Sequence, residues 1–456
     1  MGMESTRLEE YKFSRYNSKI ELGEDVYLYN SITRGYGKLN ETNRKLLQSI
    51  NFDGEVSQSI PNEIMDDEDF LQKLISGKFI VRKDLDEVRF LKSLHYGARY
   101  LNVNSFGITI IPTFACNFRC PYCFERDQNY PSISMNEEVM NKTIELIRSK
   151  AKKDGYISVN WFGGEPLLEL KKIRYMQTAF NNIAKEAGAN IFTGIVTNGY
   201  LLNKEASDEL VELGIKNVQI TIDGNKKIHD SKRMLVNGMG TYERILENLI
   251  AANESLGISV RVNIDRNNVK CMEEFLDSLA AMGLNKKKNI QLYFSVLRDY
   301  DNSVSCVAQN CYVIRDYAEE ESRLYELAMN KGFYIRRIPT PNISNCGAVS
   351  PNAIVVEPDG GLQKCWSVIG DESKRVGHLL EEDNSLYELN HVRWLGWDAF
   401  EDTNCVECKR LPLCMGGCPY FSIFGEKPGS QYKCNPLLYN LEDTLKVIAY
   451  QNASNE

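Results

Sequence analysis

The chain has 456 residues, which is too long for one simple hydrophobic core and predicts two or three domains. Its 54 basic and 62 acidic residues give a net charge of −8, and no basic stretch marks a track for nucleic acid. Since no apolar run approaches the roughly 18 residues of a membrane helix and the first residues lack a signal-peptide core, we expect a cytoplasmic protein with no nucleic-acid or membrane partner.

Residues 1–105 are predicted to form a small α+β module. Two candidate strands, KFSRYNSKIEL and DVYLYNSIT, flank a turn at Gly23, and Asn40 or Thr42 is the expected cap of the next helix. A helix over DEDFLQKLIS, a stop at Gly77, a short strand and a further helix follow. Small helices with a β wing are typical of a winged-helix fold. A structural cap on the main domain is the alternative.

Residues 106–300 alternate between strands and amphipathic helices. The expected strands cover 107–112, 156–162, 191–198, 217–223, 258–265 and 290–296. Such β-then-helix units predict a parallel sheet, either doubly wound or rolled into a barrel. In both folds the reactive groups lie at the carboxyl ends of the strands, where a cysteine loop and the segments GGEP, TNG, IDG and IDRNN fall.

The rest of the chain divides into a connector at 301–345, a cysteine-rich domain at 346–440 and a tail at 441–456. The connector shows no clear pattern. The cysteine-rich domain is expected to open with a β-hairpin that turns at Pro358-Asp359-Gly360. A helix is predicted near 436–450.

The cysteines are grouped along the chain. Of the 13, three fall at 116–123, seven lie between 346 and 434, and the others are Cys271, Cys306 and Cys311. In a reducing compartment such groups indicate metal ligands or catalysis rather than disulfides. Three thiolates in one loop can hold three irons of a [4Fe–4S] cube and leave the fourth iron open to a reactant.

The loop CNFRCPYCFE resembles the C-x3-C-x2-C motif of the radical S-adenosylmethionine (SAM) superfamily, with Phe124 as the aromatic residue that follows. The resemblance implies an α/β fold with a partial (β/α)6 barrel. It also implies that Cys116, Cys120 and Cys123 hold a cluster whose open iron binds the amino and carboxylate groups of SAM. The reduced cluster would then cleave SAM to a 5′-deoxyadenosyl radical, which abstracts hydrogen from the substrate.

Motifs after the later strands extend this resemblance. GGEP matches the family motif that contacts the SAM ammonium group, and its members are Gly163, Gly164, Glu165 and Pro166. The glycines allow close backbone approach, and the glutamate adds an acceptor. Asn198 and Asp223 fall where relatives place polar groups near the nucleoside or substrate, and Asp223 is the candidate proton acceptor. Taken singly, such motifs have a turn or a helix cap as the alternative.

The later cysteines resemble the seven-cysteine signature of SPASM domains, which hold two auxiliary [4Fe–4S] clusters. The resemblance assigns an outer cluster to Cys405, Cys408, Cys414 and Cys434, and an inner cluster to Cys346, Cys365 and Cys418. With the cysteine loop this makes three clusters. A zinc knuckle at 405–418 is the alternative. The fourth position of the inner cluster is either open, which favours chemistry on a substrate thiolate, or filled by Cys306 or Cys311.

Two subclasses of the family combine a barrel with a SPASM domain. Anaerobic sulfatase maturases oxidise Ser or Cys to formylglycine. Maturases of ribosomally made peptides often carry an N-terminal module that binds the leader of the precursor through a strand edge. Because more than 100 residues precede Cys116, we favour a peptide maturase.

Thioether formation from Cys is the leading hypothesis for the reaction, and carbon–carbon cross-linking is the runner-up. Either reaction needs a flavodoxin- or ferredoxin-type electron donor, and auxiliary clusters accept or relay the electron that leaves the substrate. An electron carrier or an iron sensor is the non-enzymatic alternative. SAM-dependent release of 5′-deoxyadenosine distinguishes the enzyme from both.

Overall fold

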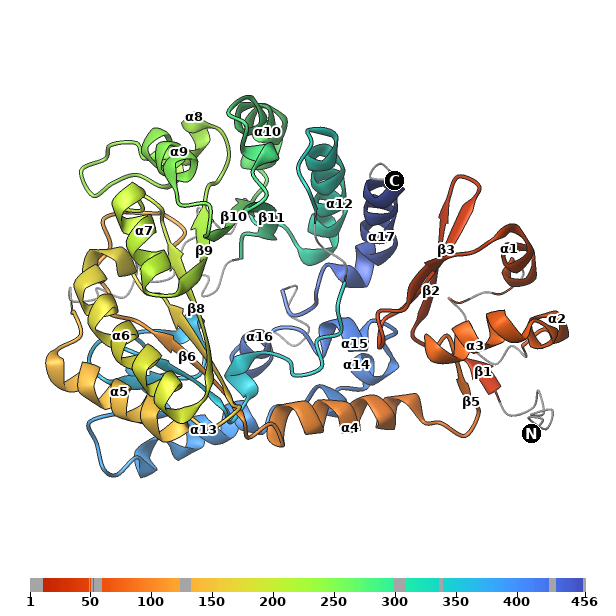
Figure 1. Cartoon of the computed structure of the whole chain (residues 1–456), viewed down its shortest axis with the longest axis horizontal. Coiled ribbons are helices and arrows are strands. Elements are labelled where there is room, and N and C mark those ends of the chain that lie inside the picture. The colour runs from red at the N-terminus through yellow and green to blue at the C-terminus, as the bar shows by residue number, and fades with distance from the viewer. Residues whose placement is uncertain are drawn as a thin grey trace.

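The computed structural model describes residues 11–48, 50, 52, 60–123, 133–298, 309–335, 339–425 and 432–453. Three parts follow one another in the chain (Figure 1). The N-terminal module lies at one end of the molecule and the main α/β part at the other, and much of the cysteine-rich part lies between them.

The N-terminal module contains a three-stranded antiparallel sheet in the order β2-β3-β4. Its strands are β2 (Asn17–Leu22), β3 (Asp25–Asn30) and β4 (Tyr36–Lys38), and β1 (Tyr11–Phe13) pairs separately with β5 (Ile80–Arg82). Gly23 makes the predicted turn with φ +58°. The helices are α1 (Glu41–Leu47), α2 (Asn62–Asp66) and α3 (Glu68–Ser76). Asn40 is the cap of α1, because its side chain accepts a hydrogen bond from the Asn43 amide.

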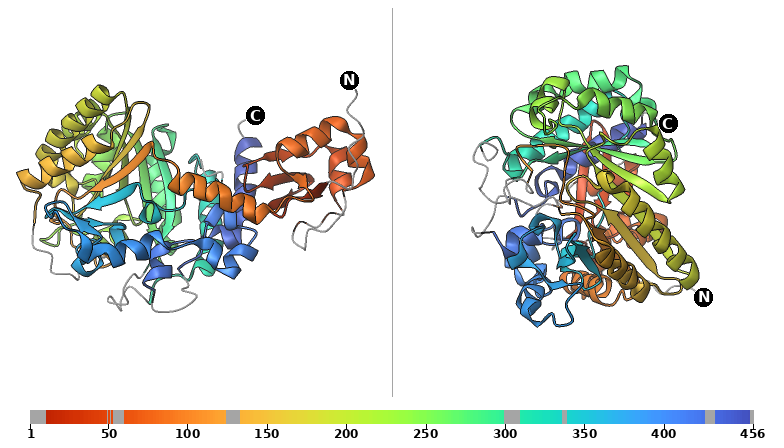
Figure 2. Two further views of the ribbon diagram at one scale, coloured as in Figure 1. Left: turned by 90° about the horizontal axis from the view of Figure 1, so that it is seen from below. Right: turned by 90° about the vertical axis from the view of Figure 1, so that its left-hand side faces the viewer.

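Helix α4 (Glu87–Tyr100) joins the module to the main part and lies along the cysteine-rich part (Figure 2). Its buried face carries Glu87, Leu91, His95 and Arg99, whereas Leu94 is exposed. Arg99 is buried and donates to the carbonyl oxygens of Val349, Leu395 and Trp397 at 2.7–2.8 Å. Polar contacts therefore help to hold this helix in place. The spacing of its apolar residues along the sequence does not predict these contacts.

The main part contains a nine-stranded sheet in the order β11-β10-β9-β8-β7-β6-β12-β13-β14. All six predicted strands are present and parallel to their neighbours: β6 (Ser105–Ile110), β7 (Tyr156–Trp161), β8 (Asn190–Thr197), β9 (Ile215–Thr221), β10 (Gly257–Ile264) and β11 (Ile290–Val296). Helices connect them and cover the outer face of the curved sheet: α5 (Glu137–Lys150), α6 (Leu170–Ala187), α7 (Lys204–Glu212), α8 (Lys226–Lys232), α9 (Tyr242–Ala251) and α10 (Met272–Ala281).

The two faces of this sheet differ in chemistry. Alternate side chains such as Ile108, Val159 and Ile220 are buried in the main core with the helices. The opposite set includes Arg261, which donates to Asn263 on its own strand and to Ser295 on the next strand, and Gln219, which accepts from the Tyr293 hydroxyl two strands away. The inner face is therefore polar, and it leads to the carboxyl ends of the strands, where the cysteine loop begins.

The predicted hairpin is confirmed as β12 (Ala353–Val356) and β13 (Gly361–Gln363), with Gly360 at φ +100° in its turn. It is not a separate unit, because β12 pairs in parallel with β6, and β14 (Gly377–His378) continues the sheet beyond β13. The cysteine-rich part also contains α13 (Glu388–Leu395), α14 (Thr403–Glu407), α15 (Leu411–Cys414) and α16 (Pro419–Ile423). This shared sheet places the cysteine-rich part beside the barrel.

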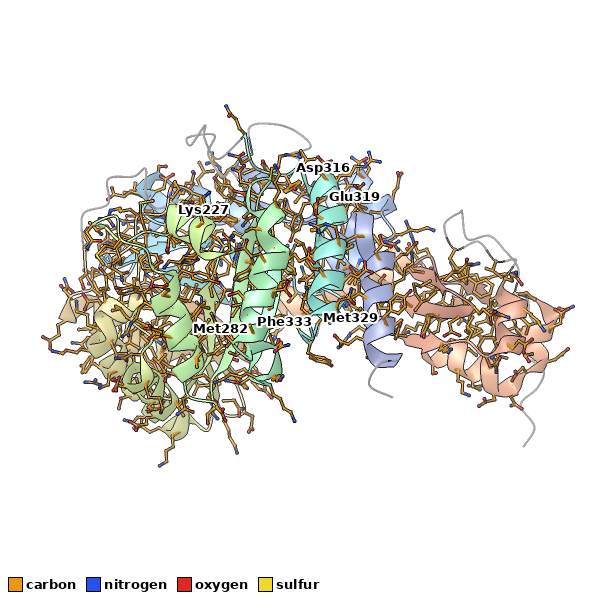
Figure 3. The ribbon with its side chains drawn as sticks, turned by 90° about the horizontal axis from the view of Figure 1, so that it is seen from above. Lys227, Met282, Asp316, Glu319, Met329 and Phe333 are labelled. Atoms are coloured by element: carbon orange, nitrogen blue, oxygen red, sulfur yellow. The ribbon has the colours of Figure 1, made fainter. Side chains whose placement is uncertain are left out.

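The connector contains a helix that was not predicted from the sequence. Helix α12 (Ile314–Asn330) packs against α17 (Leu437–Ala453), and α17 also packs against β2. Figure 3 shows α12, marked by Asp316 and Met329, next to α17. The helix predicted near 436–450 is α17, and it crosses the expected tail boundary at residue 440. In the described part of the chain, no helix has both the length and the apolar character that crossing a membrane requires.

Candidate active site

The cysteine loop leaves the carboxyl end of β6 and is fixed by backbone contacts. The Arg119 amide donates to the Met234 carbonyl at 2.9 Å, and the Val236 amide donates to the Asn117 carbonyl at 3.0 Å. Within the loop, the Phe118 amide donates to Cys116 Sγ at 3.4 Å. The structure brings Cys116, Cys120 and Cys123 to the wall of one pocket. Soft sulfur donors of this kind suit an iron–sulfur cluster.

The two glycines of GGEP approach the cysteine loop too closely for a side chain. A Cβ atom on Gly164 would lie 2.4 Å from the carbonyl oxygens of Phe114 and Ala115. Gly163 has φ +120°, and a Cβ there would lie 2.7 Å from the Thr113 carbonyl oxygen. Only glycine fits both positions, so this backbone forms a narrow wall next to the cysteines.

Glu165 joins the ends of β7 and β8 instead of facing solvent. Its carboxylate is fully buried and accepts hydrogen bonds from the Thr197 hydroxyl and the Asn198 amide, both at 2.7 Å, and from the Leu167 amide at 3.0 Å. Burial raises its pKa, and these three donors oppose the rise. Pro166, also buried, begins the short 3₁₀ turn that follows. The carboxylate therefore holds the loop that carries Asn198.

Asn198 connects this loop to the cysteine loop. Its side-chain amide donates to Asn117 Oδ1 at 2.7 Å, and its Oδ1 accepts from the Tyr200 amide at 3.0 Å. It lines the same pocket as the three cysteines and the two glycines. The structure thus gathers most of the candidate SAM-binding residues in one place.

The pocket has a volume of about 240 Å³ and reaches from the cysteine loop to the cysteine-rich part. Trp366 and Ser367, which directly follow Cys365, form part of its lining. Trp366 stacks on Phe162 with ring centroids 5.5 Å apart. Arg233, Arg261 and Arg298 also line it, and no acidic residue does so among the residues described. The pocket therefore lies between the cysteine loop and the inner cysteine group.

Asp223 lies behind Tyr122. It is fully buried, accepts from the Tyr122 hydroxyl and from the Asn263 amide, and is absent from the described lining of the pocket. Arg233 donates to the same hydroxyl at 2.8 Å. Burial raises the pKa of Tyr122, so the phenol stays protonated and donates to Asp223. Tyr122, which the sequence places inside the cysteine motif, carries this network to the pocket wall.

Two residues named in the sequence analysis, Phe124 and Cys306, lie outside the described residues. Cys311 is buried in the main core, next to Asn310, whose carbonyl accepts from the Arg266 amide at 2.9 Å.

The inner cysteine group is assembled from three segments. Burial raises the pKa of Cys365 to about 12, and the charges of Cys346 and Cys418 add to the rise. Cys346 is exposed as a residue, yet loss of hydration also raises the pKa of its thiol, and the nearby Lys364 ammonium opposes that rise. The three thiols are therefore close neighbours in a poorly hydrated site that contains one lysine.

The outer group forms a second neighbourhood. Burial raises the pKa of Cys405 to about 12, with Cys414 and Cys434 among the charges that add to it. Burial likewise raises the pKa of Cys414 to about 11, with contributions from Cys434 and Cys408. Lys433 lowers the pKa of Cys405 and pairs with Asp402. Burial also raises the pKa of Cys434, and the charge of Cys408 adds to that rise.

Both groups fit thiolate-bound clusters in their donor chemistry. Buried thiols that resist ionisation alone lose their protons when a metal binds them, and the adjacent lysines offset the negative charge that results. One buried donor in the cluster that borders Cys405, the Tyr16 hydroxyl, finds no hydrogen-bond partner among the residues that the structure describes. Over the same residues, no three His, Cys, Asp or Glu side chains are arranged to hold a single metal ion.

Known proteins share this architecture. Residues 110–279 match the sequence model of the Radical SAM superfamily. A cysteine-type anaerobic sulfatase-maturating enzyme of Clostridium novyi is 24% identical over 375 residues, which are 74% of this chain and 96% of that protein. The radical SAM cyclopropyl synthase TigE of Paramaledivibacter caminithermalis is 21% identical over 90% of this chain and 89% of its own length.

A solved structure extends the likeness to almost the whole chain. Streptococcus suis SuiB, bound to its precursor peptide SuiA, covers 92% of this chain and 98% of its own, with a TM-score of 0.52 and 13% identity. The cofactors of this fold are SAM and [4Fe–4S] clusters. With the cysteine loop, the glycine wall and the cysteine-rich part next to the pocket, residues 110–279 form a radical SAM domain, and the chain is an enzyme that resembles the SPASM-containing radical SAM maturases.

Proposed function

We propose that this enzyme is a maturase of a ribosomally made precursor peptide and that it forms a thioether cross-link from Cys. Relatives named as a cyclopropyl synthase and as a sulfatase-maturating enzyme, and a solved structure with a bound precursor peptide, support a peptide substrate. The sulfatase-maturating relative matches 74% of this chain, whereas TigE matches 90%. That difference favours a precursor peptide over a sulfatase.

One observation carries the proposal. The pocket has Cys116, Cys120 and Cys123 on its wall together with Trp366 and Ser367, which follow Cys365 of the inner group. When bound, SAM and the clusters supply a 5′-deoxyadenosyl radical at the cysteine loop and an electron acceptor at the inner group. A peptide segment in this pocket therefore lies between the two.

The reaction balances as a two-hydrogen oxidation of the peptide. A C–H hydrogen atom is transferred to give 5′-deoxyadenosine, and the cysteine thiol loses its proton. When the thiolate sulfur bonds to the carbon radical, one electron must leave. The same pocket serves carbon–carbon cross-linking, the runner-up, and formylglycine formation, because both also begin with hydrogen abstraction.

The chain's own residues position the reactants. The glycine wall at Gly163 and Gly164 would leave room for the methionine end of SAM, and Asn198 lines the same pocket. Asp223, the candidate proton acceptor, reaches the pocket through Tyr122, and its immediate role is to orient that phenol. Trp366 stacks on Phe162 and closes the side of the pocket towards the inner group.

The N-terminal module would bind the leader of the precursor. The order β2-β3-β4 leaves β2 and β4 at the edges of the sheet, and no described strand pairs with the outer side of either. An extended leader can add a strand to such an edge through backbone hydrogen bonds. A flavodoxin- or ferredoxin-type protein of the cytoplasm would supply the electron for SAM cleavage.

The test combines reconstituted enzyme, SAM, a reductant and a synthetic Cys-containing precursor peptide. We expect 5′-deoxyadenosine, a peptide that has lost two hydrogens, and one thiol fewer by alkylation. With a precursor that has Ser in place of the Cys, the enzyme should still cleave SAM but should not form the cross-link. Loss of two hydrogens with every thiol retained would assign carbon–carbon cross-linking, and an unchanged peptide mass would contradict peptide maturation.

A further inference from the structure

Tyr16, in the turn between β1 and β2, has a buried hydroxyl whose partner is missing from the described protein. The residue has no exposed surface, and its hydroxyl forms no hydrogen bond with any described residue. A buried hydroxyl that is left unsatisfied destabilises the folded state. Because native structures rarely retain such a group, a partner other than the described residues is expected at this position.

The phenol lies against the loop that carries the outer cysteine group. Tyr16 packs in one apolar cluster with Leu411 and Met415, and half-buried Cys405 packs against that cluster. Burial raises the pKa of Tyr16, and Cys408 is among the nearby charges that add to the rise. Tyr16 therefore belongs to the cluster that borders Cys405, and the charge of Cys408 acts on its hydroxyl.

Contacts on both sides of Tyr16 fix it in this place. Arg15 Nη2 donates to the carbonyl oxygens of Val406 at 3.2 Å and Glu407 at 2.9 Å, which lie between Cys405 and Cys408 in the chain. Arg410 Nη1 donates to Ser18 Oγ at 2.7 Å. The turn is thus held against the cysteine loop at residues on each side of Tyr16, so the phenol has little freedom to move away.

We propose that the Tyr16 hydroxyl donates a hydrogen bond to a sulfur of the outer auxiliary cluster and thereby raises its reduction potential. Hydrogen bonds to the sulfurs of a cluster stabilise the reduced state, which carries more negative charge. The proposal rests on ligation of that cluster by Cys405, Cys408, Cys414 and Cys434. Through Tyr16, the N-terminal module becomes part of the surroundings of a redox centre in the C-terminal part.

The test uses the full chain with Cys116, Cys120 and Cys123 replaced by Ala and reconstituted anaerobically, so that only the two auxiliary clusters remain. Iron content should be about eight per chain. Redox titration followed by EPR then compares this parent with Tyr16→Phe and with Tyr29→Phe. Tyr29 is a matched control, because it is equally buried on the adjacent strand but donates to the Pro339 carbonyl at 2.8 Å.

The hydrogen bond should be stronger to the reduced cluster, which carries more negative charge, than to the oxidised cluster. We therefore expect Tyr16→Phe to lower the reduction equilibrium constant of one cluster about tenfold, which is about 59 mV for a one-electron couple. The second cluster and both clusters of Tyr29→Phe should keep the parent potentials. If Tyr16→Phe and the parent have equal reduction potentials with about eight irons each, the proposed hydrogen bond is wrong. The assignment of the outer cluster ligands would still stand.

A second probe keeps the shape of the side chain in case Tyr16→Phe loses the cluster. Site-specific 3-fluorotyrosine at position 16 makes the hydroxyl more acidic and a stronger donor. The potential of the same cluster should then rise. If both cluster potentials of the 3-fluorotyrosine protein equal those of the parent, the proposal is wrong. A parent with only about four irons would overturn it as well, because the outer ligation itself would be wrong, whatever the peptide activity.

Discussion

The cysteine loop of the barrel and the outer cysteine group differ in what surrounds their thiols. Cys116, Cys120 and Cys123 line an open pocket with polar strand ends and a glycine wall. Cys405 and Cys414 lie in a poorly hydrated site, packed partly by the N-terminal module, where burial raises their pKa values. An open centre can exchange a ligand for a reactant, whereas an enclosed one is limited to passing electrons.

The inner cysteine group is buried like the outer group but adjoins the pocket through Trp366 and Ser367. A substitution in it is expected to have the largest effect on peptide product. Cys365→Ala should abolish the peptide product while 5′-deoxyadenosine is still released, because hydrogen abstraction needs the cysteine loop and bond formation needs an electron acceptor. Mass spectrometry and nucleoside chromatography of one reaction measure both.

Cys271→Ala is the control for that experiment, because Cys271 lies outside all three groups and its thiol donates to the Asn268 carbonyl at 3.2 Å. If Cys365→Ala forms the peptide product at the wild-type level, the inner group is not the electron acceptor that bond formation needs.

Narrowing the glycine wall tests whether the open side of the barrel loop binds SAM. In Gly164→Ala the new Cβ would lie 2.4 Å from two carbonyl oxygens, so the wall must shift. Overpacking of this kind costs about 1–3 kcal/mol, and we expect SAM to bind about 10–100-fold more weakly by calorimetry. Gly97→Ala, with no atom within 4 Å of its Cβ, should bind SAM normally. Equal affinities would show that the wall does not form the SAM site.

Glu165 tests the support beneath the open pocket. Its carboxylate accepts three hydrogen bonds, and an amide in its place turns an NH₂ group towards a donor. Glu165→Gln should therefore lower the free energy of unfolding by about 1–3 kcal/mol in denaturant titrations. Glu186→Gln, which breaks an exposed pair with Arg148, should lower it by less than about 1 kcal/mol. A similar loss in both variants would contradict a structural role for the buried carboxylate.

A pH effect, the smallest of the four, comes from His229 beneath the same pocket. Burial holds its pKa well below the usual 6.5, so the folded chain keeps it neutral while the unfolded chain takes up a proton. Stability should therefore fall as the pH falls below about 6.5, by up to about 1.4 kcal/mol per pH unit from this residue. Denaturant midpoints at pH 7 and pH 5.5 should differ less in His229→Asn than in the wild type. An unchanged difference would show that His229 does not contribute.

Strong local signals made much of this architecture predictable. The six strands of the barrel, the turn at Gly23 and the hairpin at Gly360 follow from apolar runs bounded by turn residues. The cysteine motifs carry the family resemblance. Pairing of β12 with β6 is a long-range contact that no short pattern encodes, and it joins the cysteine-rich part to the barrel.

Other features depend on tertiary contacts that the sequence does not display. Helix α12 was missed although Ile314, Tyr317, Ala318, Leu324 and Ala328 recur at helical spacing. The buried face of α4 combines Leu91 with polar residues, of which Arg99 donates to the carbonyl oxygens of Val349 and Trp397. Tyr122 lies within the cysteine motif, but its bond to Asp223 joins loops that follow different strands.

The central claim is that an open SAM cluster and two enclosed auxiliary clusters coexist in one chain. Iron and sulfide content after anaerobic reconstitution tests it most directly, comparing the wild type with the Cys116, Cys120 and Cys123→Ala variant. We expect about twelve irons per chain in the wild type and about eight in the variant, with loss of all SAM cleavage. A wild type with about four irons and bound zinc would contradict it, because the C-terminal cysteines would then form a zinc module.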